Sequence, residues 1–336
     1  MMIVGTAIFI FYLYFVGFWQ VVQVILALDV GIALSTILID LSCIGLFALG
    51  WKLLLGPPGM GIIHCFEVVL VSIFGDMMIP TGSISGEIFR ITLTVKKSKL
   101  KISEVTASVL LHRLILGLTF GGVLGYSIAM LIFTETMQFA TLSLLIAIGA
   151  IDIVLGIIGV YAVFNVHKFT KFVGGLVMRS RRFVRLFNSN YNAEETKNKI
   201  IGGFETFHNS VVGVKNPKLI TSGAILTLRW FIVALVPYLM FFSLGYPVSY
   251  WVVLAVSILV SMVQMIPIGI PGLVGVMEVS MTTFFIGFGI STDIAASATI
   301  LTRLVMFWFE LLISAATTSY VGVKEVLADG KKARAL

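Results

Sequence analysis

Long apolar runs, separated by short polar or glycine- and proline-bearing breaks, extend along nearly the whole chain. They cover residues 3–28, 31–54, 61–79, 84–95, 104–133, 139–166, 219–243, 250–266, 273–290 and 294–322. A membrane-spanning helix needs about 20 mainly apolar residues, and most of the runs are long enough. The pattern therefore predicts an all-α polytopic membrane protein, with residues 1–336 forming a single membrane domain.

The composition supports this prediction. Hydrophobic residues make up 59% and charged residues 12% of the 336 residues, whereas about a quarter of an average soluble domain is charged. The mean hydropathy is +1.07. No large aqueous domain fits beside the apolar runs.

Basic residues are unevenly distributed between the connections. Residues 167–218 form the one long polar stretch and carry ten of the Lys and Arg residues, so we expect a basic cytoplasmic segment lying on the membrane surface. The connections near residue 29 and at 134–138, 244–249 and 291–293 contain no Lys or Arg. The positive-inside rule then predicts a multi-pass protein of the cell membrane with both termini in the cytoplasm.

This topology predicts two hairpins. Residues 61–95 must enter from the cytoplasm and return to it, and residues 250–290 must enter from the outside and return there. The arm 84–95 would be about 18 Å long as a helix, shorter than the roughly 30 Å of hydrocarbon. We therefore expect a re-entrant first hairpin, while the depth of the second turn stays open.

Two halves of the sequence resemble each other. The matched segments are 78–82 with 265–269, at the hairpin turns, and 110–115 with 300–305, in the helices that follow. Residues 3–133 and 139–322 each read as helix, helix, hairpin and helix, but start from opposite sides. We therefore predict two inverted-topology repeats, an architecture in which binding sites lie where broken helices meet near the midplane.

The two hairpin turns carry the candidate chemistry. Proline removes a backbone donor and glycine permits unusual dihedral angles, so both turns should break the helix and leave amides and carbonyls free. In lipid such backbone is tolerated only inside protein or beside a water-filled cavity. Free amides at a helix start bind anions, and a simple helix kink is the alternative interpretation.

Ionisable residues near these turns are costly at membrane depth unless they are paired or hydrated. Glu87 and Arg90 are three residues apart and can pair along one helix face. Arg113 and Arg303 have no acidic neighbour one turn away, so each needs a partner from elsewhere or an anionic ligand, for which a phosphate is suitable. Further charges within the runs rank lower, with Asp152 and Glu310 as possible proton acceptors or arginine partners. The lower-ranked residues are Asp40, Glu67, Asp76, Asp152, Arg229 and Glu310.

Residues 80–90 and 267–278, with Trp51 and Lys52 at the end of the second run and Arg113 after the first hairpin, resemble the transmembrane region of lysylphosphatidylglycerol synthases. This region is also found alone as a flippase-like family, and the resemblance covers nearly the whole chain. It implies a unit that moves aminoacylated phospholipid, or another polar lipid or polyprenyl-linked carrier, between leaflets. The residues that it places along the path are Gly86, Glu87, Arg90, Gly275, Glu278 and Arg303.

The chain departs from the family pattern at two points. The resemblance leads us to expect Glu-Arg followed by Asp three residues later, but this chain has His112, Arg113 and Leu116. The presumed local partners of Arg113 are therefore missing, which weakens the role that the resemblance gives it. The sequence also lacks the soluble synthase domain, so lysylphosphatidylglycerol itself is not implied as the lipid.

We expect a lipid flippase or scramblase that moves a polar phospholipid or lipid-linked carrier and binds its anionic headgroup. The alternative is a secondary transporter of a small anionic solute. Metal-ligand, Ser-His-Asp, phosphate-loop and dinucleotide patterns are missing, so we expect no enzyme activity, cofactor or metal, and no nucleic-acid partner. A homo-oligomer is possible. The candidate substrate-binding residues are Gly82, Gly86, Glu87, Arg90, Arg113, Gly272, Gly275, Glu278 and Arg303.

Overall fold

The computed structural model describes residues 2–56, 59–134, 139–187, 192–212 and 216–334. The chain is 86% helical, and the described residues contain no strand. Five stretches are long and apolar enough to cross a membrane: Val30–Leu54, Ile102–Thr134, Thr141–Tyr161, Pro217–Ser243 and Thr292–Val323. The prediction of an all-α polytopic membrane protein is confirmed.

Three of these stretches are single helices and two are interrupted. The single ones are α3 (Val30–Leu54), α6 (Ile102–Thr134) and α7 (Phe139–Phe164). The fourth consists of α10 (Asn216–Val233) and α11 (Leu235–Ser243), and the fifth of α14 (Thr292–Arg303), the π-helix η2 (Leu304–Phe309) and α15 (Glu310–Arg334). Pro237 has no N–H to donate to the carbonyl of Val233, which explains the break between α10 and α11.

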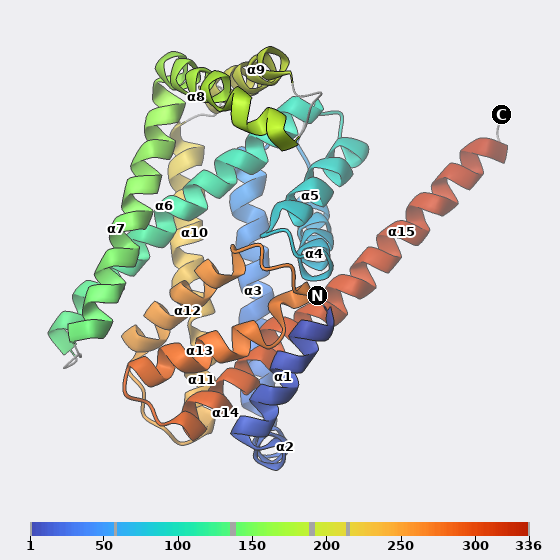
Figure 1. The fold of residues 1–336 in the computed structure, drawn as a ribbon. Coiled ribbons are helices and arrows are strands. Elements are labelled where there is room, and N and C mark those ends of the chain that lie inside the picture. The colour runs from blue at the N-terminus through green and yellow to red at the C-terminus, as the bar shows by residue number, and fades with distance from the viewer. Residues whose placement is uncertain (1, 57–58, 135–138, 188–191, 213–215, 335–336) are drawn as a thin grey trace.

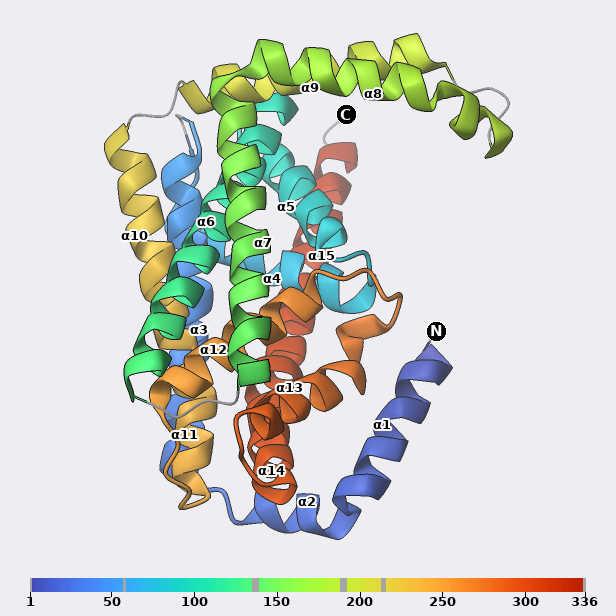
Figure 2. The same cartoon turned by 60° about the vertical axis from the view of Figure 1, so that its left-hand side comes forward.

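The N-terminal run differs from its prediction. A single helix over residues 3–28 is wrong, because Gly17 has a φ of 92° and separates α1 (Met2–Val16) from α2 (Phe18–Leu26). Helix α2 lies across one end of the bundle, and α1 begins beside its middle (Figures 1 and 2). With 15 residues, α1 is shorter than the about 20 residues of a full span. The expected cytoplasmic position of the N-terminus stays a prediction.

Two helical hairpins enter the bundle from opposite ends. The first joins α4 (Ile62–Met78) to α5 (Ile84–Lys97), and the second joins α12 (Tyr250–Gln264) through the short helix η1 (Pro271–Leu273) to α13 (Val276–Gly287). Their turns lie partway along the bundle, near each other (Figure 2).

The two turns touch through their backbones. A Cβ atom added to Gly82 would lie 2.6 Å from the carbonyl oxygen of Met265. Since the bare glycine backbone allows this approach, the first hairpin turn is packed directly onto the second. The two segments that the sequence comparison paired are therefore neighbours in space.

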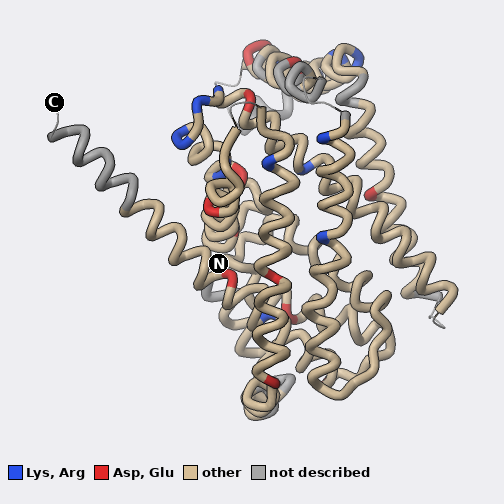
Figure 3. Tube along the Cα trace, turned by 180° about the vertical axis from the view of Figure 1, so that it is seen from behind, with Lys and Arg blue, Asp and Glu red and all other residues tan. Residues whose placement is uncertain are grey.

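The polar stretch 167–218 contains two helices that lie across one end of the bundle. They are α8 (Val166–Phe187) and α9 (Ala193–Val212), and they lie crosswise to the long helices (Figures 1 and 2). Lys and Arg residues gather at this end (Figure 3). The ends of α6 and α11 and the start of α14 lie at the other end (Figure 1). Of the connection 134–138, predicted to be outside, residues 135–138 are not among the described residues.

Each hairpin belongs to one of the two largest apolar cores. One packs α3, α4, α5 and α6 around Trp51, whose Nε1 donates a hydrogen bond of 3.1 Å to the Ser108 hydroxyl. The other packs α6, α10, α11, α12, α13 and α14 around Phe241 and Phe285, whose rings lie edge to face with centroids 4.8 Å apart. Both hairpins are thus packed against neighbouring helices through buried apolar side chains.

Candidate functional site

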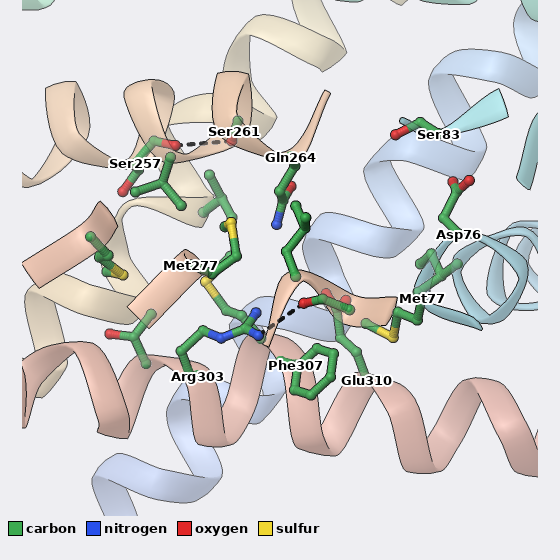
Figure 4. A pocket seen from close by; sticks show the side chains of 18 of the residues that line it. Asp76, Met77, Ser83, Ser257, Ser261, Gln264, Met277, Arg303, Phe307 and Glu310 are labelled. Carbon is green, nitrogen blue, oxygen red and sulfur yellow. Dashed lines mark hydrogen bonds between the residues drawn. The ribbon is translucent and has the colours of Figure 1, made fainter. Parts of the chain in front are cut away.

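Arg303, the last residue of α14, is bound to the second hairpin. Its Nε donates a 2.7 Å hydrogen bond to Glu278, and its Nη2 donates a 3.1 Å bond to the carbonyl oxygen of Gly272. The side chains of Arg303 and Glu278 are 7% and 2% exposed. The guanidinium also lies 4.1 Å from the centroid of the Phe307 ring (Figure 4). Arg303 thus finds its partner on the hairpin and not on its own helix.

Arg113 of α6 makes the corresponding contacts with the first hairpin. Its Nη1 donates to Glu87 at 2.5 Å, and its Nη2 lies 3.5 Å from the carbonyl oxygen of Gly82. This pair is less buried, with side chains 33% and 20% exposed. The alternative in which Glu87 pairs with Arg90 is therefore wrong, because Arg113 takes the Glu87 carboxylate.

The two constellations have nearly the same spacing along the chain. Each arginine reaches a glycine carbonyl 31 residues earlier. The glutamate lies 26 residues before Arg113 and 25 before Arg303. Gly82 and Gly272 have φ values of 66° and 58°, a left-handed conformation that is easy for glycine and costly for other residues.

In each hairpin, a backbone amide near the start of the second arm already donates a hydrogen bond within the protein. The Gly86 amide donates to the Asp76 carboxylate at 2.7 Å, and the Ser85 hydroxyl donates to the same group at 3.0 Å. The Gly275 amide donates to Glu278 at 2.7 Å. The expectation that these amides are free to bind an anion is therefore wrong for Gly86 and Gly275. Asp76, which ranked low in the sequence, is a structural part of the first hairpin.

Arg90 is held mainly by aromatic rings. Its side chain is buried, and its guanidinium lies over the rings of Phe47 and Trp51, 5.5 and 4.9 Å from their centroids. Its Nε has no hydrogen-bond partner among the described residues. Arg90 thus fixes the first hairpin against α3, and it does not line the cavity described next.

A cavity of about 270 Å³ lies where the hairpin turns meet (Figure 4). Of the predicted site residues, Gly82, Gly272 and Arg303 line it, whereas Glu278 and Gly275 lie behind Arg303 through the hydrogen bonds above. The side chains at its wall are mixed in character, and the polar ones are Asp76, Ser83, Arg229, Ser257, Ser261, Gln264, Thr302, Arg303 and Glu310. The guanidinium groups of Arg229 and Arg303 therefore lie at a cavity whose wall is partly polar.

Sequence reasoning gave low rank to three residues that the fold brings together, Asp40, Arg229 and Glu310. They come from α3, α10 and α15. Their separation along the chain hides the cluster from any local motif, and the only signal was the cost of a charge inside an apolar run. Within the described part of the chain, no group of three or more His, Cys, Asp and Glu residues has the arrangement of a metal site.

Comparison with known proteins places the chain in a family. The family model of the lysylphosphatidylglycerol synthase transmembrane region matches residues 2–314. A UPF0104 membrane protein of Pyrococcus horikoshii is 25% identical over 93% of this chain and 94% of its own length. A UPF0104 membrane protein of Methanothermobacter thermautotrophicus is 24% identical over 88% of each chain. The match covers both hairpins and both arginines, and the chain therefore belongs to the family of the lysylphosphatidylglycerol synthase transmembrane region.

Proposed function

We propose that this protein moves a polar lipid with an anionic headgroup, a phospholipid or a lipid-linked carrier, from one leaflet of the cell membrane to the other, as a flippase or scramblase. The observation that carries the proposal is the duplicated constellation at the hairpins. In each, a left-handed glycine, a glutamate and an arginine hold the hairpin turn, and both turns meet at one cavity.

The arrangement of the helices supports an inverted repeat. In the half 3–133, α3 and α6 flank a hairpin that enters from the end covered by α8 and α9. In the half 139–322, α10–α11 and α14–α15 flank a hairpin that enters from the other end (Figures 1 and 2). We infer that both hairpins are re-entrant and that the halves are related by a two-fold axis in the membrane plane. The first helix of each half departs from this relation, since α1 is short and α7 is long.

The cavity offers a place for a headgroup phosphate. Arg229 and Arg303 both line it, and a guanidinium binds phosphate oxygens with two parallel N–H groups. Arg303 already donates to Gly272 and Glu278. A phosphate that takes over one of these contacts therefore loosens the second hairpin from α14. We infer that headgroup binding and hairpin movement are linked in this way.

A secondary transporter of a small anionic solute is the second candidate. The volume favours it, because about 270 Å³ is near the lower end of the about 300–1,000 Å³ usual for small-molecule sites. A cavity of this size holds a headgroup or a solute, and acyl chains must stay outside it. The two candidates differ in whether the substrate reaches the cavity from lipid or from water.

The experiment is lipid movement in vesicles. The purified full chain is reconstituted in vesicles that contain a trace of headgroup-labelled phosphatidylglycerol, and an impermeant reductant bleaches the label in the outer leaflet. The proposal predicts that nearly all label becomes accessible in protein-containing vesicles and about half in protein-free ones. Uptake of radiolabelled inorganic phosphate without lipid movement supports the solute transporter instead. Repeating the assay with phosphatidylcholine and a polyprenyl phosphate identifies the headgroup class.

A further inference from the structure

In the described part of the chain, no hydrogen bond or ion pair joins Asp40, Arg229 or Glu310 to a hairpin turn. The Asp40 side chain is almost fully buried, at 1% exposure, and Glu310 lies at the wall of the cavity (Figure 4). The two carboxyl groups lie within hydrogen-bonding reach of each other. Asp40 Oδ2 is buried, and no N–H or O–H group of the described residues donates to it.

Two ionised carboxylates cannot form such a contact favourably. Each is only an acceptor, and their like charges repel. One proton held between them supplies the missing donor and removes one negative charge, as in pairs of acidic side chains that share a proton. A shared proton therefore makes the contact favourable.

The nearby arginine matches the charge of the singly protonated pair. Arg229 interacts electrostatically with both carboxyl groups. Its guanidinium lies 5.4 Å from the Phe47 ring centroid and 5.5 Å from that of Trp230. With one bound proton, the charges of Asp40, Glu310 and Arg229 sum to zero. Without it, a net negative charge remains in a buried place, which is costly.

Other titratable groups around the pair come from four helices. Arg303 of α14 interacts with Glu310, and Cys43 lies one turn along α3 from Asp40. Asp76 of α4 lines the same cavity, and His112 of α6 interacts with Arg229. Neither carboxyl is therefore insulated from the charges that line the cavity.

The π-helix η2 connects this cluster to the hairpin contact. It occupies Leu304–Phe309, so that Arg303 precedes it and Glu310 follows it. Single π turns within α-helices are rare and are frequent at functional sites. A change in the winding of this turn alters the relative direction of Arg303 and Glu310. The proton-bearing pair and the hairpin-binding arginine are thus adjoining parts of one helix.

We propose that Asp40 and Glu310 form a proton-binding site in which one proton is shared by two carboxyl groups, and that this site is coupled to the anionic ligand in the cavity. The proton passes between water and a carboxylate oxygen, and no other bond is made or broken. A negative headgroup near Arg229 and Arg303 favours proton uptake, and by linkage a bound proton favours the headgroup. The coupling rests on the proposed function, whereas the proton site does not.

The proton site is tested by infrared spectroscopy of the full chain in lipid nanodiscs near neutral pH. We expect the C=O band of a protonated carboxyl that shifts in deuterium oxide and is lost in both Asp40→Asn and Glu310→Gln. The Gln amide can donate to Asp40 and reproduces the charge of the protonated pair, so this variant should fold. Glu67→Gln is the control, because Glu67 pairs with Lys97 away from the cavity. A band that survives both substitutions in folded protein overturns the proposal.

The coupling is tested by lipid movement at several pH values. We expect the rate of lipid movement by the wild-type protein to change with pH. The rate of Glu310→Gln should stay constant, because Gln does not ionise and the pair keeps the charge of its protonated form. A pH dependence that Glu310→Gln retains refutes the coupling. If the wild-type protein moves no lipid but its infrared band is lost in both variants, the proton site stands and the coupling falls together with the proposed function.

Discussion

Arg303 is hydrogen-bonded to the carbonyl oxygen of Gly272, which lies 31 residues earlier in the turn of the second hairpin. Arg113 reaches Gly82 across the same number of residues. A single contact of this kind would simply give a buried guanidinium a hydrogen-bond acceptor. Two of them, at hairpins that enter from opposite ends and touch at their turns, show that both turns are held by the same kind of arginine–carbonyl contact.

The two ion pairs should differ in their contribution to stability. Arg303→Ala leaves Glu278 buried without a counter-charge, and breaking such a buried pair costs about 3–5 kcal/mol. Arg113→Ala should cost less, because the Arg113 and Glu87 side chains are 33% and 20% exposed and water compensates for the loss. Thermal unfolding in detergent measures both. A greater loss for Arg113→Ala contradicts the assignment of burial.

A paired substitution separates charge from packing. In Glu278→Gln with Arg303→Gln no charge remains at the site, so the double variant should be more stable than Arg303→Ala. Glu278→Gln alone should lower the melting temperature, because Glu278 accepts from Gly275 with one carboxylate oxygen and from Arg303 with the other. Gln replaces one of these oxygens by an NH2 group, which only donates, and removes the negative charge beside Arg303. If Glu278→Gln is as stable as the wild-type protein, the carboxylate does not hold this hairpin.

The contact between the turns predicts a strong effect of a single methyl group. Gly82→Ala must place its Cβ 2.6 Å from the Met265 carbonyl oxygen, at a φ of 66°. The left-handed backbone alone costs about 1–2 kcal/mol for a residue with a Cβ. We expect a lower melting temperature and less lipid movement. Gly125→Ala on α6 is the matched control, because a Cβ there meets nothing within 4 Å, and it should leave both properties unchanged.

The topology is open to test with single cysteines. Replacing the buried Cys43 and Cys65 by alanine gives a background for Lys171→Cys on α8 and Ser291→Cys before α14, both at exposed positions. The basic end should face the cytoplasm, so an impermeant thiol reagent added to intact cells should label only residue 291. Labelling of residue 171 under these conditions reverses the orientation.

Sequence patterns predicted the helices and hairpins because their apolar runs and glycine-proline turns are local features. They also predicted that Arg113 and Arg303 need partners. They named Glu87 and Glu278 as candidate site residues but did not identify them as these partners, because each pair is closed by the packing of a hairpin on a distant helix. Asp40 and Glu310 meet across nearly the whole chain, beyond the reach of any local motif. Nor did they predict the break at Gly17, since isolated glycines are common within apolar helices.

The most direct test of the central claim is the lipid movement of Arg303 variants in the vesicle assay. Arg303→Ala should abolish movement in protein that remains folded, and Arg303→Lys should restore part of it, because an ammonium keeps the charge but loses the two-pronged contact with phosphate. Arg179→Ala, on the exposed surface of α8, should move lipid at the wild-type rate. Movement by Arg303→Ala at the wild-type rate, with each phospholipid tried, would contradict the account.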